Sequence, residues 1–103
     1  MGALAYTVTA SFVDPAVADQ WLRWLTGGHV AEVLAAGAVA AEITVLDGPG
    51  HVLEVRYHFP SRPVFEEYER LHAPRLRAEG LRLFPPGRGI SYQRSVGAVV
   101  YRS

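Results

Sequence analysis

The chain lacks two residue types whose absence removes whole classes of chemistry. Cysteine is missing, and all ten basic residues are arginine, so lysine is missing as well. Disulfides, thiolate nucleophiles, cysteine-ligated metals and lysine Schiff bases are therefore excluded. The formal net charge is zero, and no apolar stretch reaches transmembrane length. With no signal peptide visible at the N-terminus, we expect a cytoplasmic protein with no nucleic-acid partner and no membrane partner.

What the chain has in abundance is hydrophobic residues, which make up 50% of its sequence. Its 103 residues suit one domain, which we place over residues 1–103. A domain of this size buries roughly 60–70% of its unfolded surface when it folds alone, so a second copy would help to stabilise it. The composition therefore predicts a modest core with apolar surface left for a partner.

Hydrophobic spacing predicts six secondary-structure elements. Alternating apolar residues are typical of half-buried strands, and apolar residues three or four positions apart are typical of helices. Asp14 and Ser61 are suited to cap one helix each at its N-terminal end. The predicted strands are residues 4–13, 38–47, 51–59 and about 90–101, with one helix after the first strand and one after the third.

Glycine and proline interrupt several of these elements. Gly27 and Gly28 predict that the first helix is kinked or divided. Pro74 predicts the same for the second helix near His72, because proline removes a helical hydrogen bond and clashes with the preceding turn. Gly97 predicts a bulge or a break in the last strand.

This order of elements predicts an α+β protein with the ferredoxin-like arrangement βαββαβ. Two strand-helix-strand halves with right-handed crossovers form one four-stranded antiparallel sheet, with the first and third strands in its centre. Both helices then cover one face of the sheet and meet the apolar residues of the strands. The opposite face has no helix to cover it.

The helix-free face carries our candidate ligand-binding site. Glu54, Arg56 and His58 alternate along the third strand and project to this side. Thr9 of the first strand and Glu42 of the second strand are expected to join them. Arg56 would hold an anion, His58 would donate or accept a hydrogen bond, and Glu54 would orient Arg56. A solvated sheet face with cross-strand ion pairs is the more common origin of such a pattern.

The four histidines do not converge in the predicted fold. His51 and His58 have opposite parity on one strand, whereas His29 and His72 fall beside the two helix irregularities. The sequence points to no further ligands, so we predict no metal and no cofactor. If the protein is an enzyme, His58 and His72 are the candidates for a catalytic base.

Two further features favour structural roles. Trp21 and Trp24 lie at helical spacing, which predicts core packing rather than a cofactor site. Arginines alternate with glutamates along the second helix, and Arg77 is one of them. This mixture predicts a solvated helix face and not an RNA-binding patch.

Several short motifs together resemble a known family. The motifs are Tyr6-Thr7-Val8, Asp14, Trp24, His29, Val33-Leu34, Gly37, His72-Ala73-Pro74, Leu76-Arg77, Gly80, Phe84 and Tyr92-x-Arg94. Over nearly its whole length the chain is similar to an uncharacterised family of small bacterial proteins of ferredoxin-like, dimeric α/β-barrel type. The resemblance implies the fold and a homodimer, and it implies no particular reaction.

Three functional hypotheses stay open at this point, and only one of them is an enzyme. The first is a small homodimer that binds a small polar or aromatic ligand between the polar sheet face and its partner. The second is a cofactor-independent monooxygenase or isomerase, a type found in the wider dimeric-barrel group. The third is a purely structural dimerisation module. In each case we expect the apolar residues 96–101 to extend the last strand across to the partner.

Overall fold

The computed structural model describes residues 3–103 and contains a four-stranded antiparallel sheet. Its strands are β1 (Leu4–Phe12), β2 (Ala40–Val45), β3 (His51–Phe59) and β4 (Ile90–Ala98). They follow the order β2-β3-β1-β4, so β1 and β3 are central. The predicted ferredoxin-like topology is confirmed.

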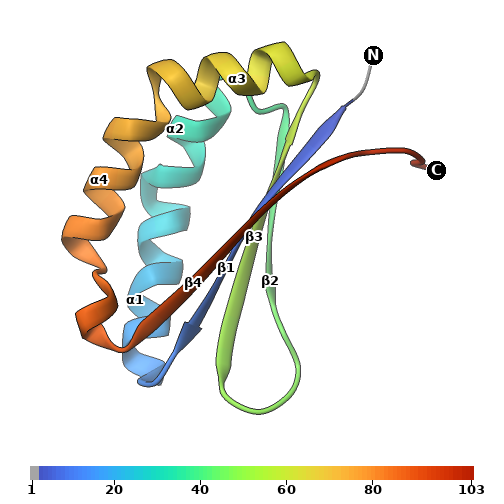
Figure 1. The fold of residues 1–103 in the computed structure, drawn as a ribbon. Helices are drawn as coiled ribbons and strands as arrows, with labels where there is room; N and C mark the ends of the chain where they lie inside the picture. The colour runs from blue at the N-terminus through green and yellow to red at the C-terminus, as the bar shows by residue number, and fades with distance from the viewer. Residues whose placement is uncertain (1–2) are drawn as a thin grey trace.

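The helices gather on one side of this sheet and leave the other side free (Figure 1). The first helical region consists of α1 (Pro15–Trp24), the π-helical turn η1 (Leu25–His29) and α2 (Val30–Ala35). The second consists of α3 (Arg62–Leu71) and α4 (Ala73–Leu83), and the short turn η2 (Pro86–Arg88) leads into β4. The prediction that the helices cover only one face of the sheet is therefore confirmed.

Both helical regions begin at the caps that the sequence predicts. The Asp14 carboxylate accepts a hydrogen bond from the Ala16 backbone N–H at 2.9 Å. The Ser61 hydroxyl accepts one from the Val64 backbone N–H at 3.4 Å. Each bond satisfies an N–H group that has no partner inside its helix, which stabilises the helix start by about 1 kcal/mol.

The two interruptions resolve differently. Gly28 has non-helical dihedral angles (φ 158°, ψ −29°), and the first helical region is kinked there, between α1 and α2. Pro74 instead divides the second region: α3 ends at Leu71 and α4 begins at Ala73, with His72 between them. Proline is tolerated in the first turn of α4 because the N–H that it lacks would have no helical partner there.

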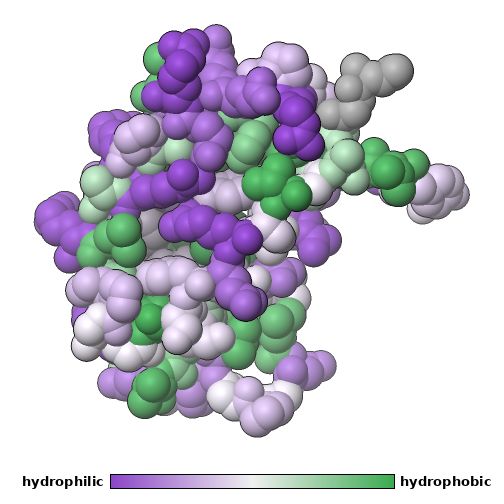
Figure 2. All heavy atoms as spheres, in the orientation of Figure 1, coloured by the Kyte–Doolittle hydropathy of each residue, from purple (hydrophilic) through white to green (hydrophobic). Residues whose placement is uncertain are grey.

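Three strands are shorter than predicted, the first of them by a single residue at its end, and one predicted irregularity is wrong. Gly97 pairs with Ala5 in the regular register of β1 and β4, so the strand has no bulge or break at that position. The strand ends at Ala98, and the Val99 N–H then donates to the Ala3 carbonyl oxygen at 2.8 Å. Beyond it, Val100 is 95% exposed on a tail that projects from the body (Figures 1 and 2). The second strand likewise covers only residues 40–45.

The hydrophobic core lies between the sheet and the helices. Alternate residues of β1 and β3 face the helices and are almost fully buried, with Ala10 and Phe59 both 0% exposed. Trp21 packs among them, as its helical spacing predicts. Complete burial of one large apolar side chain stabilises the fold by roughly 1.5–3 kcal/mol. Trp24 is only partly buried, and it borders a cavity.

Candidate functional site

The polar residues predicted on the helix-free face do come together there. Thr9 donates from Oγ1 to Glu54 Oε2 at 3.2 Å, and Arg56 donates from Nε to Thr7 Oγ1 at 3.2 Å. Arg56 also pairs with Glu54 across 3.6 Å. Glu42 lies opposite Arg56 in the register of β2 and β3. These side chains largely satisfy one another.

The two candidate base residues lie on opposite sides of the sheet. His58 lies on the helix-free face beside Ala5 and Ala40, and its Nδ1 atom is buried without a hydrogen-bond partner. His72 lies between α3 and α4 in the helix layer. His58 therefore belongs to the predicted set, whereas His72 is separate from it.

A half-open cavity lies on the other, helix-covered side, where sequence reasoning placed no site. It has a volume of about 50 Å³ and extends between the sheet, α1, η1 and α4. Most of its lining is aromatic or aliphatic. Its polar lining residues include Tyr6, His29, Tyr57, Tyr68, Arg77 and Arg94, together with Tyr92, whose hydroxyl donates to the Phe84 carbonyl oxygen.

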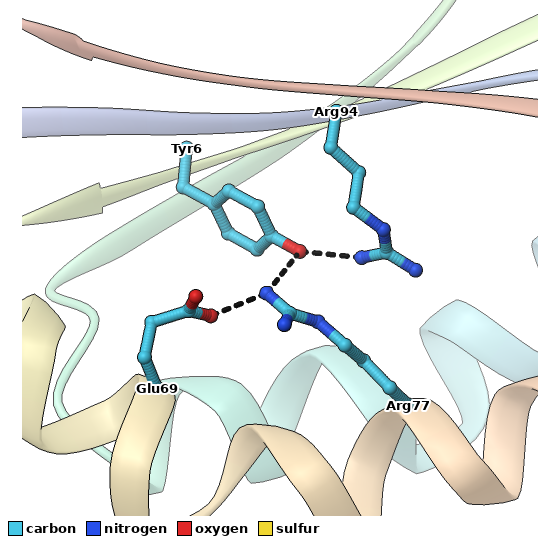
Figure 3. A network of polar contacts seen from close by, with 4 residues as sticks. All are labelled: Tyr6, Glu69, Arg77 and Arg94. Atoms are coloured by element: carbon cyan, nitrogen blue, oxygen red, sulfur yellow. Dashed lines mark hydrogen bonds and ion pairs between the residues drawn. The ribbon is translucent and has the colours of Figure 1, made fainter.

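Two arginines point at the hydroxyl group of Tyr6 (Figure 3). Arg77 of α4 donates to the Tyr6 oxygen from Nη2 at 3.2 Å, and Arg94 of β4 donates to it from Nη1. Glu69 of α3 forms an ion pair with Arg77 and holds it in place. Burial lowers the pKa of Arg77, but the hydrogen bond to Tyr6 and the charge of Glu69 outweigh burial and raise that pKa overall. Four elements thus converge on one phenol group.

The bonding around Tyr6 leaves its own proton unused. A phenol oxygen accepts two hydrogen bonds and donates one, and here the two guanidinium groups take both acceptor positions. Among residues 3–103 the hydrogen bonds of the Tyr6 hydroxyl are those two, in which it is the acceptor. Its O–H group is therefore free to donate to a bound molecule.

His29 stacks against Trp24 at the cavity wall. Their ring centres are 4.1 Å apart, and the planes differ by 22°. Trp24 immediately precedes η1 and His29 ends it, so the two rings flank the kink at Gly28. Burial lowers the pKa of His29 to about 4, with Glu32 opposing and Arg94 assisting the shift, so the imidazole is neutral at pH 7. Its Nδ1 atom is buried without a partner.

Two further tyrosines supply neutral hydroxyl groups. Burial raises the pKa of Tyr57 far above its usual range and that of Tyr68 to about 12. The Tyr57 hydroxyl is buried and lacks a hydrogen-bond partner within the described residues. The cavity thus offers cationic and neutral donors, and one neutral acceptor, in apolar walls.

Arg77 corrects one of the sequence-based predictions. We expected it on a solvated helix face, but its side chain is only 34% exposed and is turned toward Tyr6. Helical spacing does not reveal this, because glutamates and arginines surround Arg77 in the sequence. A usable signal was present, since Tyr6, Trp24, His29, Arg77 and Arg94 all belong to the motifs of the family resemblance and all line the cavity.

The described part of the chain shows neither a metal-binding cluster nor a membrane-spanning helix. No group of three or more histidine, aspartate or glutamate side chains within residues 3–103 is arranged to hold a metal ion. None of the helices in that range combines the length and the apolar character needed to cross a membrane.

Solved structures with the same fold include both dimeric proteins and oxygenases. A dimeric ferredoxin-like protein from an uncultured marine organism matches with a TM-score of 0.83 and 14% identity, over 100% of both chains. The monooxygenase ActVA-Orf6 of Streptomyces coelicolor, solved with nanaomycin D, has a TM-score of 0.73 and 16% identity, over 99% of this chain and 91% of that one. SnoaB, a cofactor-independent oxygenase from Streptomyces nogalater, has a TM-score of 0.69 and 9% identity, over 99% and 97%. At these identities the likeness establishes the fold alone.

The sequence itself matches one family model. That model is described as a domain of unknown function, DUF4286, and it covers residues 3–94. The matched range runs from the start of β1 to Arg94 and so includes every residue that lines the cavity. No curated protein matches the chain.

Proposed function

Because the chain belongs to the DUF4286 family, whose function is unknown, we propose its function from the geometry: it binds a small aromatic molecule in the cavity between sheet and helices. Three polar atoms of the residues that line the cavity are buried without a partner, and one of them is Nε of Arg77. The observation that carries this proposal is the other two, His29 Nδ1 and the Tyr57 hydroxyl. A buried polar group without a partner costs about 1–3 kcal/mol. A ligand that bonded to both would recover that free energy.

The walls of the cavity favour a flat ligand. Trp24, His29 and Tyr6 present ring faces or edges to it, and aromatic rings prefer such offset or edge-on neighbours. A cavity needs a volume of about 10–15 Å³ to hold one water molecule. The present volume of about 50 Å³ thus suits a few waters or part of one ring. A larger ligand requires the Trp24–His29 stack to move.

The glycines of η1 leave room for such a movement. No heavy atom outside the adjoining backbone lies within 4 Å of the position that a Cβ would take at Gly27 or Gly28. Gly28 also has dihedral angles outside the helical range, and the helical region is kinked at this turn. We expect η1 to be the segment that adjusts when a ligand enters.

The predicted site on the helix-free face is the competing proposal. It would use Glu54, Arg56, His58, Glu42 and Thr9, and the unpartnered Nδ1 of His58 favours it. Against it, Arg56, Glu54 and Thr9 already bond to groups of the same face. An enclosed site there would need a second subunit to cover the face.

Adjacent residues of β3 separate the two sites experimentally. Tyr57 faces the cavity and Arg56 faces away, so Tyr57→Phe and Arg56→Gln form a matched pair. Trp21 and Trp24 are the only tryptophans and both line the cavity, so their fluorescence should change when a phenol or a benzoate enters it. We expect weaker binding in Tyr57→Phe and unchanged binding in Arg56→Gln. The reverse result would move the site to the helix-free face.

We also propose that the protein is a cytoplasmic homodimer. A similar structure is described as dimeric, one sheet face is free of helices, and an apolar tail projects from the body (Figure 2). Val100 and Tyr101 on that tail are 95% and 81% exposed. Sedimentation velocity should show a dimer that weakens when residues 99–103 are deleted. A dimer of unchanged affinity would remove the tail from the interface.

Cofactor-independent oxygenation is the second candidate function. Two similar structures are named as a monooxygenase and a cofactor-independent oxygenase, and His29 brings a neutral acceptor to the cavity. In such a reaction a hydroxyarene and O₂ give a quinone and water. One oxygen atom becomes the new carbonyl group, and the other leaves as water with two substrate hydrogens. A pKa of about 4 makes His29 a weak base, so binding is the stronger proposal.

Oxygen uptake tests this second candidate. With 1-naphthol as substrate, consumption should be lost in His29→Phe and kept in His58→Ala and His72→Ala. Loss in His58→Ala instead would restore that residue as the base. No uptake above that of the buffer, with binding intact, would leave a binding protein.

A further inference from the structure

One guanidinium group at the cavity has no carboxylate partner. The ion pairs among residues 3–103 use Arg56, Arg75 and Arg77, and Arg94 takes part in none of them. Arg94 nevertheless lines the cavity and donates one hydrogen bond to Tyr6. A guanidinium group has five N–H donors. Most of the donors of Arg94 are therefore available to another molecule.

The charges around Tyr6 do not cancel. Arg77 and Arg94 contribute two positive charges and Glu69 contributes one negative charge, which leaves a net charge of +1. No aspartate or glutamate lines the cavity to offset this excess. The protein as a whole is neutral, so the excess is a local property of this site.

The free proton of Tyr6 adds to this positive end. The O–H group of Tyr6 lies close to the remaining N–H groups of Arg94, because Arg94 donates a hydrogen bond to that same phenol oxygen (Figure 3). A carboxylate can accept from a guanidinium fork and from a hydroxyl together. Arg94 is an exposed residue, so an anion bound to it keeps contact with water and loses little solvation.

The unsatisfied atoms of His29 and Tyr57 are suited to a different group of the ligand, a hydroxyl. In the tautomer that carries its proton on Nε2, His29 presents Nδ1 as an acceptor that needs a hydrogen-bond donor, and the Tyr57 hydroxyl can act as a donor. A ligand hydroxyl is able to donate to one and accept from the other. A carboxylate would not suit His29, since neutral imidazole nitrogen and carboxylate oxygen are both acceptors.

We infer that the ligand is an aromatic acid that also carries a hydroxyl group, with its carboxylate at Arg94 and Tyr6 and its hydroxyl at His29 and Tyr57. This inference rests on the proposed function of the cavity. It adds a requirement for negative charge and a requirement for a hydrogen-bond donor on the ring. The aromatic ring between the two groups would lie along the Trp24–His29 stack.

Four single-ring probes separate these requirements. Calorimetric titration with 4-hydroxybenzoate, benzoate, phenol and 4-hydroxybenzyl alcohol compares the charge and the hydroxyl independently. We expect 4-hydroxybenzoate to bind tightest and the neutral alcohol to bind about ten- to a hundredfold more weakly, because a charge-assisted hydrogen bond is lost. Benzoate should fall between them.

Variants assign each requirement to its residue. Arg94→Gln should weaken the two carboxylates about tenfold or more and leave phenol unchanged, while Arg94→Lys should keep part of the preference because the charge remains. Arg75→Gln on the same protein is the matched control, since Arg75 is 60% exposed and pairs with Glu32. His29→Phe keeps a ring on Trp24 and should weaken 4-hydroxybenzoate while sparing benzoate.

The outcomes distinguish the inference from the function on which it rests. If the neutral alcohol binds as tightly as 4-hydroxybenzoate, or if Arg94→Gln binds all probes like the wild type, the acid is the wrong class while the cavity remains a binding site. If no probe produces heat or a change in tryptophan fluorescence, the proposed function itself is overturned. Circular dichroism and urea denaturation of Arg94→Gln check that the fold is intact.

Discussion

The two faces of the sheet differ in what their polar side chains bind. On the helix-free face, Arg56 bonds to Thr7 and Glu54, and Glu54 also accepts from Thr9. On the helix-covered face, His29 and Tyr57 keep buried polar atoms without partners in the described chain. Unsatisfied atoms beside a cavity are better evidence for a ligand than a cluster of mutually bonded charges, because only the former gain from binding.

One residue of the helix-free face, His58, departs from this difference. His58 on the helix-free face also has a buried Nδ1 atom without a partner. It lies beside the small residues Ala5 and Ala40, which contribute no polar side chain. A second subunit over this face could supply a donor to His58. The two faces would then serve different purposes, ligand binding inside the subunit and association outside it.

The largest difference between the faces should appear in stability. Phe59 is 0% exposed, with ring centres of Phe65 and Tyr68 at 5.1 and 5.2 Å, whereas its neighbour His58 points away. Phe59→Ala should lower the free energy of unfolding by about 3–5 kcal/mol, and Phe59→Leu by about 1–2 kcal/mol. His58→Ala should lower it by less than about 1 kcal/mol in urea denaturation. An equal loss in His58→Ala would mean that the dimer buries the helix-free face.

The cavity face should also respond to acid through His29. Between about pH 6.5 and the folded pKa of about 4, the unfolded chain holds a proton on His29 that the folded protein does not. The free energy of unfolding therefore falls as the pH decreases through this window, by about 1–2 kcal/mol for a partly buried group. Urea denaturation at several pH values should show this component lost in His29→Phe and kept in His51→Gln, whose histidine is exposed. A wild-type slope in His29→Phe would contradict the shift.

Removing single hydroxyl groups tests the unsatisfied atoms directly. Tyr92 donates to the Phe84 carbonyl oxygen at 2.8 Å, so Tyr92→Phe should destabilise the protein by about 1 kcal/mol. Tyr57 has no such partner, so Tyr57→Phe should leave the unliganded protein unchanged or stabilise it by up to about 1 kcal/mol. Thermal unfolding of both variants gives the comparison. A clear loss in Tyr57→Phe would show that its hydroxyl is bonded, for instance to water.

The smallest effect is expected on the helix-free face. The Arg56 side chain is 44% exposed and its pair with Glu54 spans 3.6 Å, so solvent screens the interaction. Arg56→Gln should change the free energy of unfolding by about 0.5 kcal/mol or less. Chemical denaturation at low and high salt would reveal a stronger pair as a salt-dependent difference. A loss above about 1 kcal/mol would mean that a partner encloses this face.

The fold could be predicted from the sequence because the patterns that specify it involve neighbouring residues. Alternation along residues 4–12 and 51–59 specifies which side chains face the helices, and the register places Thr9 opposite Glu54. The caps at Asp14 and Ser61 and the division at Pro74 each depend on a few neighbouring residues. The prediction of a bulge or break at Gly97 was wrong because a glycine in a strand is compatible with a bulge and with regular pairing alike.

The cavity could not be predicted from the sequence in the same way, because the residues that line it are distant in the chain. Tyr6 is 71 residues from Arg77 and 88 residues from Arg94, although all three meet at one oxygen atom. An arginine within a charged helix face has the same local pattern whether it points to solvent or inward. Only the packing of α4 against the sheet turns Arg77 toward Tyr6.

The sequence by itself therefore determined the order of strands, the two faces of the sheet and the polar set around Arg56. These follow from periodicity and chain connectivity, which act over neighbouring residues. The tertiary structure alone decided which polar atoms find partners, since that depends on contacts between β1, β4, η1 and α4. It left His29 and Tyr57 unsatisfied beside a cavity and Arg94 without a carboxylate, and those three groups carry the function we propose.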